Sequence, residues 1–419
     1  MNRTFSLNRI VFIVTVAFSC FTAFLALGFS ASPAAAIAPT ATATNVKPTA
    51  TRTPSAAVPT AVRTATSARP TATRTPTQPA TVPSPIPQAS TKTSVRHNGN
   101  QFALLVNGQP TYIKGLNYNV NYTELSVDLR LELHRRDFKI MRDMGVNAIV
   151  GWGIYDEITL QVADEFGIGV IMPFDLPANG DYDNANYRNQ IKSDFREYVQ
   201  RFRNYHAVWG WNPGGDELLY RMDTEEHRTE DKLQHAANLE LEMVLIAQSL
   251  DPNHFNLIKE PRDWYIKYLG SAMSNNPSGS HILGSNLIYG VNVYGRYEDI
   301  EMALVNAKVT LADQLGLTMM VSEFGPFNSP REERATHYAG IWNIVTRISD
   351  VGGLAYVFGP DQPNPNAPNP YDPLALLPNQ YSLVDVNGTP IDNALATLTI
   401  QWRMFPIHIS MTGNSTTAP

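Results

Sequence analysis

The sequence predicts an α/β fold, a (β/α)₈ (TIM) barrel, over about residues 94–406. From residue 94 onward, short β-rich runs alternate with amphipathic helical segments, and we count eight strands over about 260 residues, the usual size of such a barrel. The strands are apolar throughout, as expected for a parallel sheet that is buried on both faces. The competing fold, a doubly wound open sheet, usually has a glycine-rich first turn, and Gly-Leu-Asn-Tyr at 115–118 is not one.

The barrel region begins with an expected hairpin. Residues 102–106 and 111–114 are strand-like and flank Asn107-Gly108, a pair that favours a tight turn, and the second strand continues to residue 118. A helix at 128–144 has apolar residues on one face and ends at Gly145. The remaining strands are expected at 146–150, 169–174, 207–211, 255–259, 287–294, 317–322 and 353–358, and the remaining helices at 156–166, 187–202, 232–250, near 264–269, 300–315 and 332–348.

The N-terminal segment has the pattern of an export signal. Residues 10–28 are apolar and uncharged, Arg3 and Arg9 precede them, and three alanines at 34–36 follow. We expect a signal peptide over residues 1–36 and a secreted or cell-surface protein. The apolar run is also long enough to cross a bilayer, so an uncleaved anchor that attaches the chain to a membrane through residues 10–28 is the alternative.

Residues 37–93 are predicted to be a disordered linker. They consist mainly of Thr, Ala and Pro with scattered Arg, and such a segment buries too little apolar area to offset the entropy lost on ordering. The last residues, 407–419, are expected to form a flexible tail. Cys20 is the only cysteine, so no disulfide is expected in the exported part.

Composition also bears on partners. The net charge is −6 and the sequence shows no basic cluster, which argues against a nucleic-acid partner. The histidines show no paired spacing such as His-Glu-x-x-His, so we expect no metal and no cofactor. We expect a monomer.

Acidic residues follow several of the predicted strands. In a TIM barrel the active site forms at the C-terminal ends of the strands, and five acidic residues stand there: Asp175, Glu217, Glu260, Glu323 and Asp361. Cleavage of a glycosidic bond uses two such carboxyl groups. One donates a proton to the leaving oxygen, and the other, in its ionised form, attacks the sugar carbon.

Two motifs resemble a known group of enzymes. Trp-Gly-Trp-Asn-Pro-Gly-Gly-Asp-Glu at 209–217 resembles the strand-four motif of clan A glycoside hydrolases, and Val-Ser-Glu-Phe-Gly at 321–325 resembles their strand-seven motif. The chain is similar in particular to the family 2 enzymes and the β-1,3-glucanosyltransferases, and the resemblance covers about residues 100–404. Further matches lie at 107–110, 113–118, 144–149, 292–294, 381–385 and 388–390.

The resemblance implies a role for each matching residue. Glu217 would be the general acid/base and Glu323 the nucleophile of a retaining mechanism, with their carboxyl groups about 5 Å apart rather than the roughly 6.5–9.5 Å of inverting enzymes. Glu217 would then need a raised pKa. Tyr294 would orient Glu323, unless it is an ordinary core residue. The other expected substrate contacts are Asn117, Asp216, Glu260, Trp152 and Trp211, although Trp211 also suits the core of a strand.

Three departures from the clan's pattern leave the function open. Asp216 stands where the clan has Asn, Val150 stands where it has an Arg near the nucleophile, and Tyr-Val-Phe at 356–358 replaces a common Trp. Lys114 or Lys259 could supply the missing positive charge. The leading hypothesis is a retaining glycosidase or transglycosylase acting on β-linked oligo- or polysaccharides. The alternatives are a non-catalytic carbohydrate-binding protein and a scaffold on the same barrel.

Overall fold

The computed structural model describes residues 90–99, 101–152, 155–224, 229–261, 264–276 and 286–404. The predicted signal or anchor, the predicted linker up to residue 89 and the predicted tail lie outside these residues. Among the described helices, none combines the length and the apolar character needed to cross a membrane.

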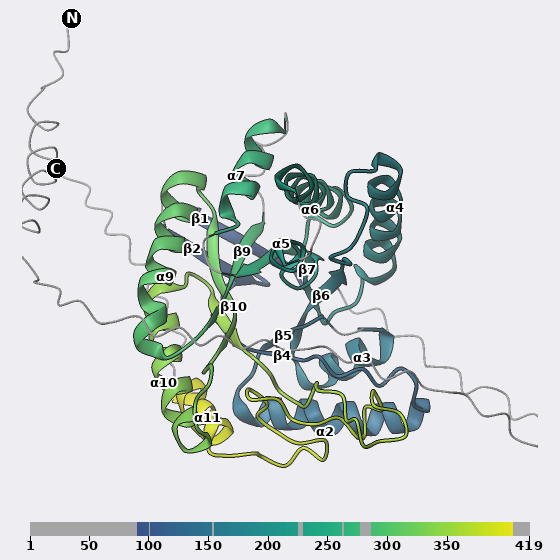
Figure 1. The fold of residues 1–419 in the computed structure, drawn as a ribbon, viewed down its shortest axis with the longest axis vertical. Coiled ribbons are helices and arrows are strands. Elements are labelled where there is room, and N and C mark those ends of the chain that lie inside the picture. Colours follow the sequence, from purple (N-terminus) through teal and green to yellow (C-terminus); the bar gives the residue numbers. More distant parts are fainter. Residues whose placement is uncertain are drawn as a thin grey trace, which may run out of the picture. The chain divides into compact units, whose positions relative to one another are not determined.

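The described residues form a closed barrel of eight parallel strands, as predicted (Figure 1). Neighbouring strands follow chain order, and the last strand pairs with the first to close the barrel. The strands are apolar and almost entirely buried, because the interior of the barrel lies on one face and the helices lie on the other. They are β4 (Ile113–Asn117), β5 (Ala148–Val150), β6 (Gly169–Asp175), β7 (Val208–Gly214), β8 (Phe255–Pro261), β9 (Leu287–Tyr294), β10 (Thr318–Gly325) and β11 (Gly352–Ala355).

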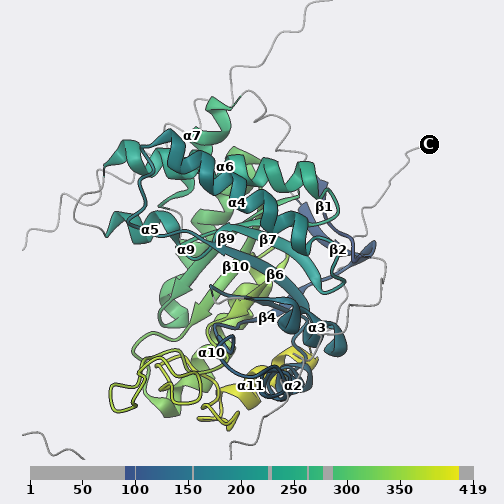
Figure 2. The same cartoon turned by 90° about the vertical axis from the view of Figure 1, so that its right-hand side faces the viewer.

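Helices cover the outside of the barrel (Figures 1 and 2). Gly145 ends α2 in the left-handed conformation, as predicted, and Gly167 ends α3 in the same way; Ser126 and Asp156 cap the N-termini of these two helices. The helices are α2 (Val127–Met144), α3 (Glu157–Phe166), α4 (Ala185–Phe202), α5 (Leu218–Asp223), α6 (Glu230–Leu250), α7 (Ile266–Asn275), α9 (Tyr297–Val309), α10 (Arg331–Ile348) and α11 (Ala394–Met404). The last of them, α11, packs against α10 and α2.

The N-terminal hairpin differs from its prediction. The turn at Asn107-Gly108 is correct, since both residues have positive φ, but strand β2 (Gln101–Val106) pairs with only two residues, β3 (Gln109–Pro110). Beyond β3 the N–H of Thr111 still donates to the carbonyl oxygen of Leu104 at 2.8 Å, and the chain then enters the barrel as β4.

A strand that the sequence did not predict, β1 (Thr93–Asn98), pairs with β2. The hydroxyl groups of Thr91 and Thr93 donate to the backbone oxygens of His206 and Trp209, at 2.6 Å each. Ordered chain with buried contacts therefore begins a few residues before position 94.

Two further boundaries were predicted incorrectly. The helix expected at 300–315 changes at Thr310 into a π-helix, η2 (Thr310–Leu315), which ends at the left-handed Gly316. The last barrel strand was expected at 353–358 but ends at Ala355. Beyond it the backbone N–H of Phe358 donates to the carbonyl oxygen of Asn117, so this segment still lies along the first barrel strand.

Candidate active site

Four side chains from neighbouring strands meet at the C-terminal ends of the barrel strands. Glu217 follows β7, Lys259 lies near the end of β8, Asn292 lies in β9, and Glu323 lies in β10. Asn292 donates to Glu217, and Lys259 contacts Glu323. Barrel closure brings them together, although 64 residues separate Lys259 from Glu323 and 75 separate Asn292 from Glu217.

The backbone before α5 aims Glu217 into this site. Glu217 has a left-handed conformation, with φ of 48°, and its N–H donates to the carbonyl oxygen of Lys259 at 3.1 Å. Two glycines with positive φ, Gly214 and Gly215, precede it. A Cβ atom on Gly215 would lie 2.4 Å from Oδ1 of Asp175, so the turn requires a glycine there. The Glu217 carboxyl accepts a hydrogen bond from Asn292 Nδ2 at 2.8 Å.

Lys259 is the central cation of the site. Its side chain is fully buried, and its Nζ lies 2.5 Å from Oε1 of Glu323 and 2.9 Å from Oδ1 of Asp216. Nζ also donates to the Asn117 side-chain oxygen at 3.3 Å. Asn117 in turn donates to the backbone oxygen of Ser322 at 3.1 Å. The positive charge that the Val150 position lacks is therefore present beside Glu323, on strand β8.

The second oxygen of Glu323 accepts a hydrogen bond from the hydroxyl of Tyr294, as expected from the sequence. The rings of Tyr356 and Tyr381 pack against Tyr294, with centroids 5.9 and 5.0 Å away. Glu323 is only 3% exposed, and both of its oxygens have partners. Its orientation is thus held from two sides.

The three charged groups influence one another. Burial, with a further contribution from Asp216, raises the pKa of Glu217 to about 7. Burial raises the pKa of Glu323 to about 8, and the Lys259 ammonium opposes that rise. Burial acts to lower the pKa of Lys259, but the contacts with Asp216 and Glu323 outweigh it and leave that pKa raised. Lys259 therefore stays protonated, and the raised pKa values of Glu217 and Glu323 both favour retention of a proton near neutral pH.

Three other expected substrate contacts, Trp152, Trp211 and Glu260, differ from one another in burial. Trp152 is 39% exposed, which suits a binding surface. Trp211 is fully buried and donates to Asp251 at 3.0 Å, so its assignment as a sugar platform is wrong. Glu260 is fully buried and accepts from the N–H groups of Leu219 and Tyr220, so it caps helix α5 rather than facing substrate.

The remaining charged residues near the strand ends have structural partners. Asp175 forms an ion pair with Arg221 at 2.7 Å, and Asp361 accepts from the hydroxyl of Tyr356 at 2.7 Å. Lys114, the other proposed source of positive charge, donates to the backbone oxygen of Trp402 instead. In the described part of the chain, no group of three or more His, Cys, Asp or Glu side chains is arranged to hold a metal ion.

Sequence reasoning missed Asn292. It donates to Glu217 and accepts a hydrogen bond from the hydroxyl of Ser322 at 2.7 Å. A signal for it was present, because Asn292 stands two residues before Tyr294 on the same strand. Residues two apart in a strand face the same side.

Comparison with known proteins supports the fold. No protein-family model matches the chain, and no curated protein sequence does. Several solved structures resemble it. A β-D-glucuronidase from Dictyoglomus thermophilum superposes with a TM-score of 0.53 and 19% identity over 75% of this chain. The fold is that of these glycosidases.

Two further solved structures resemble the barrel of this chain to a similar degree. A GH2 β-galacturonidase from Eisenbergiella tayi bound to galacturonate gives a TM-score of 0.55 with 18% identity, and a β-glucuronidase from Ruminococcus gnavus gives 0.53 with 17%, each over 75% of this chain. The chain spans about half the length of these proteins, with 53–55% of each covered. At such identities the likeness establishes the (β/α)₈ barrel alone.

Proposed function

We propose that the protein is a retaining glycosidase or transglycosylase that acts on β-linked oligo- or polysaccharides. One observation carries the proposal: Glu217 and Glu323 stand at the ends of β7 and β10, where Glu217 accepts from Asn292 and Glu323 contacts Lys259 and Tyr294. A proton donor with a pKa near 7 and an oriented carboxylate are the two parts that double displacement requires.

In the first step a carboxylate oxygen of Glu323 forms a bond to the anomeric carbon. The glycosidic C–O bond breaks, and the leaving oxygen takes the proton of Glu217. In the second step the Glu217 carboxylate accepts a proton from water or from a sugar hydroxyl. That oxygen attacks the anomeric carbon, and the bond to Glu323 breaks, which returns both groups to their initial states.

Lys259 and Asp216 are the charged groups that accompany the catalytic pair Glu217 and Glu323. With Val150 fully buried among apolar residues, Lys259 supplies the positive charge that favours the ionised form of Glu323. Asp216 is the second partner of Lys259, and as a carboxylate it accepts a hydrogen bond from a sugar hydroxyl rather than donating one.

The test is hydrolysis of a panel of aryl β-glycosides, with neutral sugars and uronic acids both included. Wild type should release the aglycone with retention at the anomeric carbon, which NMR of the first-formed sugar detects. Glu323→Gln and Glu217→Gln should lose activity, whereas Glu332→Gln, an exposed residue of α10, should not. Turnover that survives Glu323→Gln, or a product of inverted configuration, contradicts the proposal.

A second candidate is a non-catalytic carbohydrate-binding protein on the same barrel. The observation that favours it is the depth of Glu323, because burial raises the pKa of this residue to about 8 and so disfavours the nucleophilic form near neutral pH. It predicts oligosaccharide binding in a calorimeter with no release of sugar.

We also propose that the protein acts outside the cytoplasm. The support is the apolar run at 10–28 with its flanking Arg3, Arg9 and alanines at 34–36. Fractionation of cells that express the full chain, followed by N-terminal sequencing, distinguishes a cleaved signal from an anchor.

A further inference from the structure

A pocket of about 280 Å³ lies beside the ends of β9 and β10. Gly295, which lines it, directly follows Tyr294, the partner of Glu323, and its N–H donates to the carbonyl oxygen of Gly325 at 3.3 Å. Phe327, also in its lining, stands two residues beyond Gly325. The pocket is therefore built on the same strand ends that carry Tyr294 and Glu323.

The wall of this pocket combines an aromatic ring with polar groups. Phe327 is 49% exposed, so its ring is accessible at the surface of the pocket. The loop is held in place because the N–H of Asn328 donates to the side-chain oxygen of Gln380 at 3.0 Å. His337 lines the pocket and is 4% exposed, and its Nδ1 has no hydrogen-bond partner among the described residues. The other ring nitrogen of His337, Nε2, lies 3.6 Å from Glu333, which also lines the pocket.

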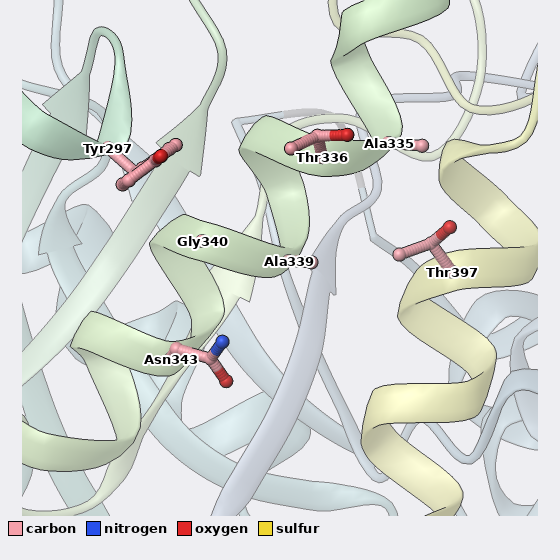
Figure 3. A pocket seen from close by; sticks show the side chains of 7 residues that line it. All are labelled: Tyr297, Ala335, Thr336, Ala339, Gly340, Asn343 and Thr397. Atoms are coloured by element: carbon pink, nitrogen blue, oxygen red, sulfur yellow. The ribbon is translucent and has the colours of Figure 1, made fainter.

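A second pocket, of about 500 Å³, lies over α10 between the start of α9 and α11 (Figure 3). In Figure 3, Tyr297 and Thr397 stand on either side of α10, which presents small and polar side chains between them. None of the described residues that line it is charged. They are Tyr297, Ala335, Thr336, Ala339, Gly340, Asn343 and Thr397.

The two pockets adjoin. The ring of Tyr297 in the second lies 5.6 Å from the ring of His337 in the first, centroid to centroid. Glu333 of the first pocket and Thr336 of the second stand three residues apart on α10, a spacing that puts them on one face of the helix. Lining residues of the two pockets are therefore neighbours on and beside α10.

We propose that the two pockets form a binding track for a neutral oligosaccharide that extends beyond the catalytic glutamates. Aromatic faces, hydroxyl groups and amides suit the apolar faces and the hydroxyls of uncharged sugar rings. The first pocket is also lined by Arg296, which is paired with Glu298 at 3.7 Å, and by Asp299 and Glu333, whose negative charges disfavour an anionic sugar chain. The track rests on the proposed function, and it makes the substrate a chain of several sugars rather than a single terminal one.

Calorimetry with Glu323→Gln protein measures the track without turnover. The probes are β-1,3- and β-1,4-linked glucose oligosaccharides of two to six units, with oligogalacturonates of equal length as the charged comparison. Affinity for the neutral series should rise with length, and Phe327→Ala should remove the rise, with about 3- to 10-fold weaker binding of the longer members. Asn343→Ala should weaken only the longest. Met302→Ala, an exposed side chain of α9 that lines neither pocket, is the matched control.

The binding track is overturned if the affinity for neutral oligosaccharides does not depend on their length. It is also overturned if Phe327→Ala and Met302→Ala lose the same amount of affinity for the longer oligosaccharides. Tighter binding of oligogalacturonates overturns its neutral character. Failure of the proposed function is a separate result, because a wild-type protein that binds the long neutral probes and hydrolyses none of them keeps the track and loses the catalysis.

Discussion

The ammonium of Lys259 lies 2.5 Å from the carboxylate of Glu323 near the C-terminal ends of barrel strands β8 and β10. Both side chains are at most 3% exposed, so neither charge is compensated by water. Each therefore depends on the other, and the same ammonium lies 2.9 Å from Asp216.

Replacing Lys259 with methionine should abolish activity and destabilise the fold. Removal of one partner of a buried ion pair costs about 3–5 kcal/mol, and Glu323 would then hold its proton and fail as a nucleophile. We expect a loss of kcat of at least about 100-fold. Thermal unfolding and kinetics measure the two effects. Lys259→Arg, which keeps the charge, is the control, and a Lys259→Met enzyme with normal activity excludes the role.

Activity should fall as the pH rises through about 7, because Glu217 has its pKa raised to about 7 and donates the proton. Asp216 contributes to that rise, so Asp216→Asn should shift the alkaline limb of the kcat/KM profile to lower pH. Burial raises the pKa of Glu323 to about 8, so the two carboxyl groups titrate as a pair, and both limbs of the profile belong to the pair rather than to one residue. An alkaline limb that does not move in Asp216→Asn argues against Glu217 as the acid.

Stability should decrease as the pH rises from about 4.5 to about 8. Burial raises the pKa of Glu240 from 4.5 to about 8 in the folded protein, so in this interval the folded state binds more protons than the unfolded state. The contribution of Glu240 to the free energy of unfolding is therefore complete below about pH 4.5 and is lost as the pH rises to about 8. Urea unfolding at several pH values measures it. Glu240→Gln should flatten the dependence, and the exposed Glu332→Gln should leave it unchanged.

Gly215→Ala should cost activity as well as stability. The new Cβ would lie 2.4 Å from Asp175, and φ of 74° is unfavourable for alanine, so the turn before Glu217 must move. Gly108→Ala is the matched control. It has φ of 79° with open space around it and lies in a hairpin away from the strand ends, so it should cost about 1 kcal/mol and leave kcat unchanged. Equal kcat values in the two variants contradict this account.

The sequence alone determined the architecture of the barrel. Apolar runs at strand spacing and helical periodicity are local properties, and the caps at Ser126, Asp156, Gly145 and Gly167 are equally local. Position at a strand end reduced the acidic candidates to five, because a TIM barrel gathers the C-terminal ends of its strands whatever the loops between them contain, and the resemblance of two motifs then selected Glu217 and Glu323.

Only the tertiary structure decided which groups contact the glutamates. Lys114 and Lys259 are equivalent in sequence, yet one donates to the backbone of Trp402 and the other to Glu323. Trp211 and Glu260 look like site residues, but their strands direct them into the core and under α5. The physical reason is that side-chain direction and burial depend on the register between strands far apart in the chain. Burial then raises the pKa of both glutamates, and the charges of Lys259 and Asp216 modify that rise.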